Sequence, residues 1–266
     1  MKSDHRARHL RTERYAAGLF SAVFRAPDLA IAVRPGQFVM LDIPGRLRPY
    51  LRRAYSVADA RPESGEVEFL VKTIGAGTAA LEELPESAIA SLLGPLGNSF
   101  SVGNLPRGMR VAVVAGGIGA APFPLLYRAL AKAGVPGDLF LGGRGKRDLA
   151  FRGRFDGVVT GETFLATDDG SLGERGVVTE VFRNRAEEIH YARVFACGPM
   201  PMLRALARVA EELALAAEFS TEAEMGCGFG ACLGCVLPGT DKPFLVSCTE
   251  GPILPPSRIL WEKLGS

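Results

Sequence analysis

Four cysteines near the carboxyl end have the spacing of a metal-binding group. Cys227, Cys232, Cys235 and Cys248 follow one another as C-x4-C-x2-C-x12-C. The glycines at positions 226, 228, 230 and 234 let the backbone wrap closely around such a group and adopt positive φ where needed. The run has too few apolar side chains for a core of its own. We therefore expect bound metal to supply much of its folding energy.

The spacing favours an iron–sulfur cluster over other metals. C-x4-C-x2-C with a distant fourth cysteine is the plant-type pattern for a 2Fe–2S cluster, in which four thiolates hold two irons. A four-cysteine zinc site is the main alternative, although zinc sites usually carry two C-x2-C pairs and only Cys232 and Cys235 form one here. Structural thiols that bind no metal are the second alternative. Cys197 lies outside this pattern.

A glycine turn in the middle of the chain is a candidate phosphate site. Gly116, Gly117 and Gly119 follow an apolar run at 110–115 and precede a helical pattern that reaches residue 133. A turn between a strand and a helix can bind phosphate through its backbone N–H groups. The glycine turn departs from the dinucleotide-binding pattern G-x-G-x-x-G, because the later positions of that pattern hold other residues here. A tight turn that binds no ligand is therefore the alternative.

A second turn of this kind contains Cys197, Gly198 and Pro199, between a predicted strand and a predicted helix. In an open parallel sheet, ligands bind at the carboxyl ends of the strands. Both turns fall at such ends, so each is a candidate ligand-binding turn.

The run formed by Arg53, Ala54, Tyr55 and Ser56 could contact a flat, charged ligand. An arginine, an aromatic ring and a hydroxyl could bind a pyrophosphate, a ring and a ring heteroatom together. Alternation puts Arg53 and Tyr55 on one face of the strand and Ala54 and Ser56 on the other. All of these residues can therefore contact one ligand only if the strand is twisted or if Ser56 contributes its backbone. An ordinary exposed strand that binds no ligand is the alternative.

Thr78, within Gly-Ala-Gly-Thr, is a predicted N-cap for the helical segment AALEEL. The N–H groups of the following turn could bind phosphate, and a plain capped helix is the alternative.

Composition limits the classes of protein that fit. The 266 residues are 47% apolar and 23% charged, which excludes wholesale disorder. The net charge of +2 gives no argument for a nucleic-acid partner. The most apolar charge-free stretch, at 111–127, is short for a bilayer span and is broken by glycines and prolines, so we expect no membrane association. A cytoplasmic location is the default, and clustered cysteines there more often bind metal than form disulfides.

The order of predicted elements divides the chain into three parts. Short β-like runs with turn signals, at 37–43, 54–58 and 67–72, suggest a small antiparallel barrel over 1–105. Predicted strands and helices alternate over 106–217, which indicates a parallel, Rossmann-like α/β domain that ends in a helix at 201–217. The cysteine segment occupies 218–266. We expect the basic residues at 1–14 to form a frayed tail, and 16–24 to be the first strand.

Taken in this order, the segments resemble the flavodoxin/ferredoxin reductase superfamily. Within it, the chain is similar to the electron transfer subunit of the bacterial, two-subunit, NAD-dependent dihydroorotate dehydrogenase. The resemblance covers nearly the whole chain, and the run MGCGFGACLGC at 225–235 is its most specific part. Its other parts are Arg34-Pro35-Gly36-Gln37-Phe38, Arg53-Ala54-Tyr55-Ser56, Gly77-Thr78, Gly94-Pro95-Leu96-Gly97, Gly116-Gly117-Ile118-Gly119 and Cys197-Gly198-Pro199.

The resemblance implies a cofactor for each part of the chain. The barrel would bind FAD, with Arg53 facing the pyrophosphate and Tyr55 and Ser56 lying against the isoalloxazine. The remaining FAD-binding positions would be Ala54, Leu70, Val71, Lys72, Gly77 and Thr78. The Rossmann-like domain would bind NAD at Gly116, Gly117, Gly119, Cys197, Gly198 and Pro199. The tail would carry a 2Fe–2S cluster on Cys227, Cys232, Cys235 and Cys248.

The resemblance also implies a partner. An FMN-containing catalytic subunit would oxidise dihydroorotate to orotate in pyrimidine biosynthesis, in a heterotetramer of two plus two. Electrons would pass through the cluster and FAD to NAD. The alternative is the small subunit of an NADH-dependent ferredoxin:NADP reductase or sulfide dehydrogenase, where the first cluster position is often Asp, so Cys227 favours the dihydroorotate enzyme. A non-catalytic zinc module is a hypothesis from a different class.

One loop raises a question about the nucleotide. The run Gly143-Arg144-Gly145-Lys146-Arg147 follows the second predicted strand of the α/β domain. Three basic side chains there could receive a 2′-phosphate, which would favour NADP, whereas the resemblance implies NAD.

Overall fold

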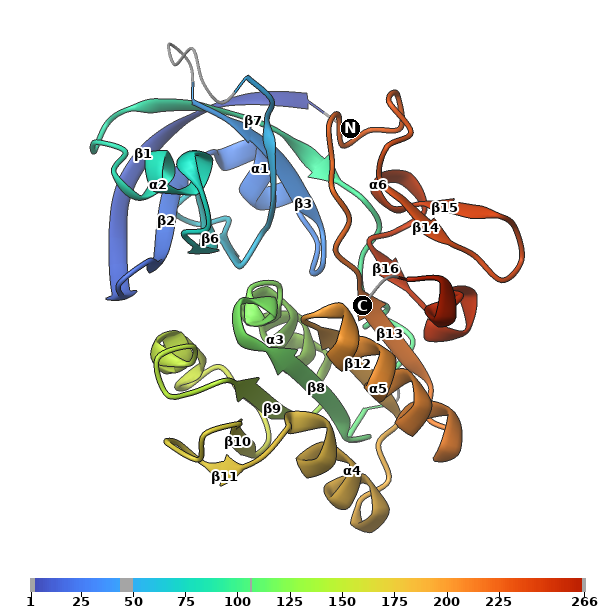
Figure 1. The fold of residues 1–266 in the computed structure, drawn as a ribbon. Coiled ribbons are helices and arrows are strands. Elements are labelled where there is room, and N and C mark those ends of the chain that lie inside the picture. The colour runs from blue at the N-terminus through green and yellow to red at the C-terminus, as the bar shows by residue number, and fades with distance from the viewer. Residues whose placement is uncertain (1–2, 44–49, 106, 265–266) are drawn as a thin grey trace.

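The computed structural model describes residues 3–43, 50–105 and 107–264. Two seven-stranded sheets and one short hairpin form its β-structure (Figure 1). The first sheet is antiparallel and the second is mostly parallel, as the sequence predicts. Among the residues that the structure describes, none of the helices has the length and apolar content needed to cross a membrane.

The first sheet has the order β4-β3-β7-β1-β2-β6-β5. In β7, every second side chain is buried, because one face of the sheet packs on the core. Helix α1 (Pro27–Ala32) adds Leu29 to this core, and α2 (Ala76–Glu82) lies between β6 and β7 in the chain. The strands are β1 (Ser3–Ala16), β2 (Leu19–Arg25), β3 (Phe38–Asp42), β4 (Arg53–Ser56), β5 (Asp59–Arg61), β6 (Glu66–Lys72) and β7 (Ile89–Leu96).

The expectation of a frayed basic tail at 1–14 is wrong for residues 3–14, and residues 1 and 2 lie outside the described residues. Strand β1 begins at Ser3 and lies inside the sheet, between β7 and β2. Ala7 and His9 point inward and are buried, while most of the basic side chains face solvent. His9 Nδ1 lies 3.0 Å from the carbonyl oxygen of Pro85, and its ring packs on Phe24. The apolar run at 16–24 is therefore the second strand and not the first.

The second sheet has the order β11-β10-β9-β8-β12-β13-β16. In its central strand β8, Val111, Val113 and Ala115 pack on the face covered by α3, whereas Ala112 and Val114 pack on the face covered by α4 and α5. Burial on both faces explains why this strand is a continuous apolar run. The strands are β8 (Val111–Gly116), β9 (Gly137–Gly143), β10 (Thr163–Thr167), β11 (Glu174–Arg175), β12 (Arg193–Cys197), β13 (Ala217–Ser220) and β16 (Ile253–Leu254). The helices are α3 (Phe123–Ala133), α4 (Val178–Glu188) and α5 (Met200–Glu212), with short 3-10 turns η1 (Gly117–Ala120) and η2 (Ala150–Phe155).

The helix predicted at 201–217 is shorter than expected. Helix α5 ends at Glu212, and Ala214 has a positive φ of 50°. The chain then forms β13, which pairs in parallel with β12. Alanine and leucine favour helix, so the local sequence predicts a helix that continues past Glu212. In the structure the chain turns there instead, because β13 has to pair with β12.

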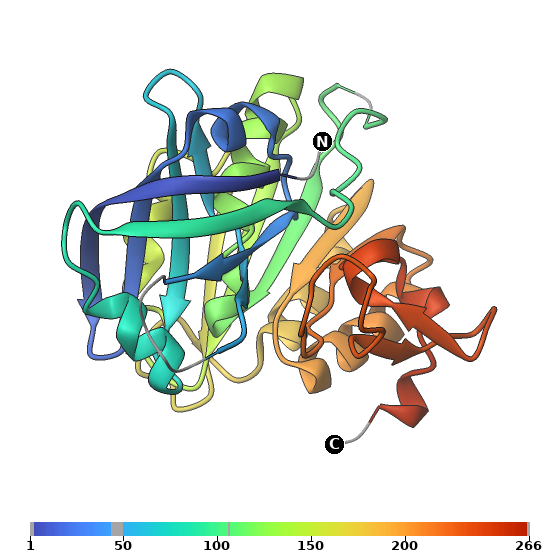
Figure 2. The ribbon, with the colours of Figure 1, turned by 90° about the horizontal axis from the view of Figure 1, so that it is seen from above.

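The C-terminal residues gather on one side of the molecule and contact both sheets (Figure 2). Strands β14 (Val236–Pro238) and β15 (Phe244–Val246) form a hairpin, followed by α6 (Ser247–Glu250) and the short turns η3 (Pro256–Arg258) and η4 (Trp261–Lys263). Strand β16 pairs antiparallel with β13. The side chain of Asn98 donates to the carbonyl of Ile253 at 2.7 Å and accepts from its N–H at 2.9 Å. These bonds tie the segment to the end of the first sheet.

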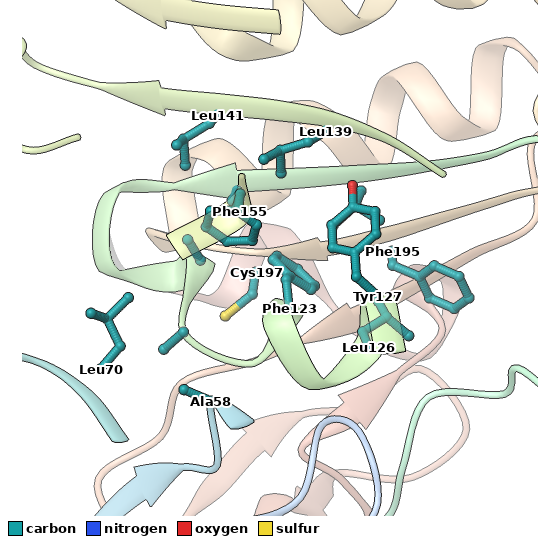
Figure 3. Close-up of a cluster of buried hydrophobic side chains, with 14 of the residues drawn as sticks. Ala58, Leu70, Phe123, Leu126, Tyr127, Leu139, Leu141, Phe155, Phe195 and Cys197 are labelled. Carbon is teal, nitrogen blue, oxygen red and sulfur yellow. The ribbon is translucent and has the colours of Figure 1, made fainter. Parts of the chain in front are cut away.

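Apolar packing and ion pairs join the two sheets. Ala58 and Leu70, from the first sheet, lie in one buried cluster with Phe123 and Phe155 of the α/β domain (Figure 3). Asp59, which is 3% exposed, accepts hydrogen bonds from Arg128 of α3 at 2.5 and 2.9 Å. The carboxylate of Glu68 pairs with Arg154.

We expect Phe195→Ala to lower the free energy of unfolding by about 3–5 kcal/mol, because it leaves a cavity in this core. Phe195 is fully buried and stacks edge-on with Phe100 at 5.3 Å between ring centroids. Phe244→Ala is the matched control, since Phe244 is 61% exposed, and should change stability by less than about 0.5 kcal/mol. Urea denaturation measures both. Equal losses in the two variants would contradict the packing described.

Candidate functional site

A cavity of about 680 Å³ opens at the carboxyl ends of the central parallel strands. Strand β8 pairs with β9 on one side and with β12 on the other, so the chain changes direction there. Ligands bind at such switch points in open α/β sheets. The structure brings the two glycine turns together in this cavity, whose lining includes Gly116, Gly117, Gly119, Gly198 and Pro199.

Close contact between the two turns requires glycine at position 119. A Cβ atom there would lie 2.5 Å from the carbonyl oxygen of Cys197. Cys197 itself is 4% exposed and is not among the cavity-lining residues. Burial, with a smaller effect of Glu222, raises the pKa of its thiol to about 12. Cys197 is therefore a neutral packing residue behind the cavity.

Arg53 and Gly77 also lie together, although they come from β4 and α2. A Cβ atom at Gly77 would lie 2.5 Å from Arg53 Nε, so the glycine leaves room for the guanidinium. Tyr55 packs its ring against Phe69 at 6.1 Å, and burial raises the pKa of its hydroxyl to about 12. Ser56 pairs across the sheet with Phe38.

Thr78 is not the N-cap of α2. Gly75 occupies that position, and Thr78 is the third residue of the helix. Its hydroxyl oxygen accepts hydrogen bonds from the N–H groups of Ile74 at 2.9 Å and Gly75 at 3.1 Å. Thr78 therefore satisfies backbone N–H groups that precede the helix from a position within its first turn. The sequence predicted the threonine at the N-cap itself.

The other residues expected around a flavin differ in exposure. Leu70 is 6% exposed and Val71 is 2% exposed, because their side chains belong to apolar clusters. Only their backbone groups are available to a ligand. Lys72, the last residue of β6, faces the cavity instead.

Lys72 takes part in an ion-pair group that connects the two sheets. Its ammonium lies 3.2 Å from Asp148 Oδ1, and Arg144 Nε lies 2.8 Å from Asp148 Oδ2. The hydrogen bond from Arg144 outweighs desolvation and, together with Lys72, holds the pKa of the Asp148 carboxyl well below its usual range. The basic loop after β9 is thus partly neutralised.

Four acidic residues line the cavity and were not anticipated from the sequence: Asp148, Asp168, Glu180 and Glu222. Asp168 directly follows β10, and Glu222 lies two residues beyond β13. Burial raises the pKa of Glu222. Their position after parallel strands is a signal that could have identified Asp168 and Glu222, because the carboxyl ends of such strands share one edge of the sheet.

The four clustered cysteines form two pairs. The Cys232 N–H lies 3.4 Å from Cys227 Sγ, and the Cys248 N–H lies 3.4 Å from Cys235 Sγ. Cys232 is exposed, whereas Cys235 and Cys248 are buried. Across residues 3–43, 50–105 and 107–264, no three His, Cys, Asp or Glu side chains converge on a single metal position.

The surroundings of two of these thiols shift their pKa values in opposite directions. Burial opposes ionisation of Cys227, but N–H groups of Cys232, Phe229 and Ala231 outweigh it and lower the pKa of this thiol to about 6. Burial, with the adjacent Cys235, raises the pKa of Cys248 to about 12. Gly228 and Gly230 have φ of 81° and 91°, which wraps the loop around the sulfur atoms.

The cysteine segment packs directly on the first sheet. Cys235 and Cys248 share an apolar cluster with Phe38, Met40 and Leu96. In the sheet, Met40 pairs with Ala54 of β4. Adjacent strands lie about 4.8 Å apart. A single strand spacing therefore separates the strand that contacts the cysteines from the strand that carries Arg53 and Tyr55.

Comparison with known families assigns two parts of the chain. Residues 17–100 match the oxidoreductase FAD-binding domain. Residues 222–260 match the iron–sulfur cluster binding domain of dihydroorotate dehydrogenase B.

Two relatives that the chain matches over at least nine-tenths of their length carry the same name. The chain is 36% identical over 242 residues to the dihydroorotate dehydrogenase B (NAD(+)) electron transfer subunit of Desulforamulus reducens, covering 90% of this chain and 91% of that protein. It is 34% identical to the subunit of the same name from Caldanaerobacter subterraneus subsp. tengcongensis, covering 98% and 100%.

Solved structures agree on the fold. The NADH-dependent reduced ferredoxin-NADP oxidoreductase superposes with a TM-score of 0.85 at 28% identity, covering 97% of this chain and 91% of that one. The ferredoxin reductase of carbazole 1,9a-dioxygenase superposes with a TM-score of 0.68 at 25% identity, covering 80% and 67%.

We expect Asp148→Asn to lower the free energy of unfolding at neutral pH by up to about 1 kcal/mol, since the pairs are partly exposed. The carboxyl has a lower pKa in the folded than in the unfolded chain, so its contribution is fully present above about pH 4 and is lost below it. The difference in the free energy of unfolding between wild type and variant should be the same at about pH 7 and about pH 5.5, and it should decrease toward about pH 3. Chemical denaturation at each pH measures it, and a constant difference would contradict the pairing.

Proposed function

The chain belongs to the family of electron transfer subunits of NAD-dependent dihydroorotate dehydrogenase B, and we propose that it carries electrons from a catalytic partner to NAD. The observation that carries this proposal is the closeness of the paired cysteines to the strand bearing Arg53 and Tyr55. Electron transfer between two bound redox groups requires such closeness. The cavity at the two glycine turns lies where a nicotinamide nucleotide could enter.

We propose FAD at β4 and α2, with Arg53 facing its pyrophosphate. Gly77 gives room to the Arg53 side chain, whose guanidinium suits a phosphate-bearing group, and the half-buried ring of Tyr55 suits a flat apolar one. Ala54, Ser56, the backbone of Leu70 and Val71, Lys72 and Thr78 complete the proposed site. Bound FAD exchanges two electrons with nicotinamide and single electrons with an iron–sulfur cluster. The chain's own contribution is to fix orientation and to exclude water through packing.

We propose a 2Fe–2S cluster on Cys227, Cys232, Cys235 and Cys248. The cysteine spacing is that of a plant-type 2Fe–2S site, and the match to an iron–sulfur family weighs against the zinc alternative. Backbone N–H groups directed at Cys227 Sγ favour the thiolate form that ligation needs at this position. A cluster of this kind supplies one-electron chemistry.

We propose that the partner is an FMN-containing catalytic subunit, in a two-plus-two heterotetramer, and that the complex works in the cytoplasm. Exposed apolar side chains lie on the cysteine segment, where such a partner could dock. Phe229 is 47% exposed, and Leu233 and Phe244 are each 61% exposed. Apolar groups left exposed in this way are typical of protein-protein contacts.

The test is a comparison of the chain with and without its partner. The purified chain should reduce an artificial acceptor such as ferricyanide with NADH but should not oxidise dihydroorotate. Adding the FMN-containing subunit should produce NAD reduction that depends on dihydroorotate, and that subunit alone serves as the control. Dihydroorotate oxidation by the isolated chain, or failure to use NADH with any acceptor, would refute the proposal.

We expect Cys232→Ser to abolish cluster assembly, because three thiolates and a hydroxyl hold two irons poorly. The serine itself is tolerated, since position 232 is exposed. Cys197→Ser is the matched control, because Cys197 lies outside the two pairs and should leave the cluster intact. Iron and acid-labile sulfide per chain, with the visible spectrum, measure the result. Unchanged iron in Cys232→Ser would rule out its ligand role.

A further inference from the structure

A second cavity, of about 980 Å³, lies between α5 and the C-terminal residues. One wall is α5 with the link at 214–217 that joins it to β13, and the other wall is the segment at 255–262. Helix α5 also borders the cavity at the glycine turns, but through Pro201, Met202 and Ala205 on another of its faces. Among the described residues, none lines both cavities. The second cavity is therefore separate from the glycine turns, and the function proposed above assigns nothing to it.

Two arginines of α5 line the second cavity one helical turn apart. Arg204 and Arg208 occupy positions i and i+4, which places their Cβ atoms about 5–6 Å apart on one side of the helix. Arg204 donates to the carbonyl of Leu264, and Arg208 is exposed. Over residues 3–43, 50–105 and 107–264, neither guanidinium forms an ion pair with a carboxylate, whereas Arg183 of α4 pairs with Glu212.

This arrangement favours a bound anion. Two like charges at i and i+4 destabilise a helix unless a negative group lies between them. A guanidinium presents paired N–H groups that match the oxygen atoms of a phosphate, and it keeps its charge at any pH the protein meets. The two arginines are therefore suited to one phosphate group.

A fixed aromatic ring lies in the opposite wall. Trp261, the one tryptophan of the sequence, lines the second cavity from the short turn η4 and is half-buried. Its indole N–H donates to the carbonyl of Pro256 at 2.9 Å, and its ring packs edge-on against Phe219 at 6.1 Å between ring centroids. A ring held in this way loses little freedom when a flat group stacks on its exposed part, and heteroaromatic bases stack well on aromatic side chains.

Two carboxylates complete the polar lining. Glu211 of α5 and Glu262 of η4 both line the second cavity and are exposed. They offset the charges of the two arginines, so the cavity suits a ligand with a single phosphate better than one with a polyphosphate chain. A carboxylate also accepts hydrogen bonds from the hydroxyl groups of a ribose. The lining thus offers partners for a phosphate, a sugar and a base.

We propose that the second cavity binds a nucleoside monophosphate. Its phosphate lies at Arg204 and Arg208, its base stacks on Trp261, and its ribose hydroxyls donate to Glu211 or Glu262. Inorganic phosphate lacks the base and a nucleoside lacks the phosphate, so each of them uses only part of the site. The inference goes beyond the proposed function and does not depend on it, because the site lies outside the proposed path of electrons.

Titration calorimetry on the full chain with its FAD and cluster tests the proposal, with UMP and AMP as the probes. We expect at least one of them to bind with a dissociation constant below about 1 mM. The matching nucleoside, the matching triphosphate and inorganic phosphate should each bind more weakly by about tenfold or more. Binding should be the same when NAD saturates the cavity at the glycine turns. Failure of both probes to bind at about 10 mM, or their displacement by NAD, would overturn the proposal.

Substitution of Arg208 tests the phosphate position. Arg208→Gln removes one of the two charges at an exposed position, so it should weaken binding of the mononucleotide by about tenfold and leave the urea midpoint unchanged. Arg208→Lys keeps the charge and should recover part of the affinity. Arg6→Gln is the matched control, because Arg6 is exposed on β1 and does not line the second cavity. Equal weakening by Arg208→Gln and Arg6→Gln, or unchanged binding in Arg208→Gln, would overturn the assignment.

Trp261 provides a readout that a merely structural role would not change. Because the chain has one tryptophan, its fluorescence reports on this cavity. Stacking of the base should quench the emission with the same dissociation constant that calorimetry gives. Calorimetric binding with unchanged emission would place the nucleotide elsewhere and overturn the proposal. NADH-dependent reduction of ferricyanide should be unchanged in Arg208→Gln, and its absence in the wild-type chain would refute the proposed function alone.

Discussion

Side chains from both sheets are buried in one apolar cluster, and this shared burial fixes the position of one sheet relative to the other. Ala58 and Leu70 come from the antiparallel sheet, yet they lie among the aromatic residues that cover the parallel sheet (Figure 3). The buried carboxylate of Asp59, held by Arg128, adds a directional contact at the same boundary. Separating the sheets would expose apolar surface and break the pair between Asp59 and Arg128, and both changes are costly. The relative position of Arg53 and the glycine turns is therefore a property of the core and does not depend on a bound ligand.

The cysteine segment depends on this arrangement. It has few apolar residues, and those it has are shared with neighbours: Cys235 and Cys248 pack against Met40, and β16 extends the parallel sheet. Asn98 joins the segment to the end of β7 through its side-chain amide. The segment therefore contacts both sheets while leaving Cys232 and several apolar side chains at the surface. This placement lets one small segment face a partner on one side and the β3–β4 pair on the other.

Much of this could be predicted from the sequence, and the errors have physical causes. The run at 110–115 predicts a buried strand because both of its faces are covered, and the cysteine spacing identified a loop in which the structure pairs the thiols. Strand β1 was missed because only a few of its side chains, such as Ala7, point inward, and its basic residues are typical of a solvated tail. The end of α5 was misplaced because alanine and leucine favour helix on both sides of the turn at Ala214. The contact of Lys72 with Asp148 joins residues 76 positions apart, which no local pattern reveals.

The position of β1 has a consequence for biosynthesis. Ser3 pairs with Gly94, and Arg8 pairs with Ile89, so residues 3–8 of β1 leave the ribosome about eighty to ninety residues before the strand that they pair with. At roughly 5–20 residues per second, this leaves an open strand edge for several seconds during translation. The alternating arginines that made the segment look like a solvated tail keep that nascent edge charged, and charged edges resist pairing with other chains.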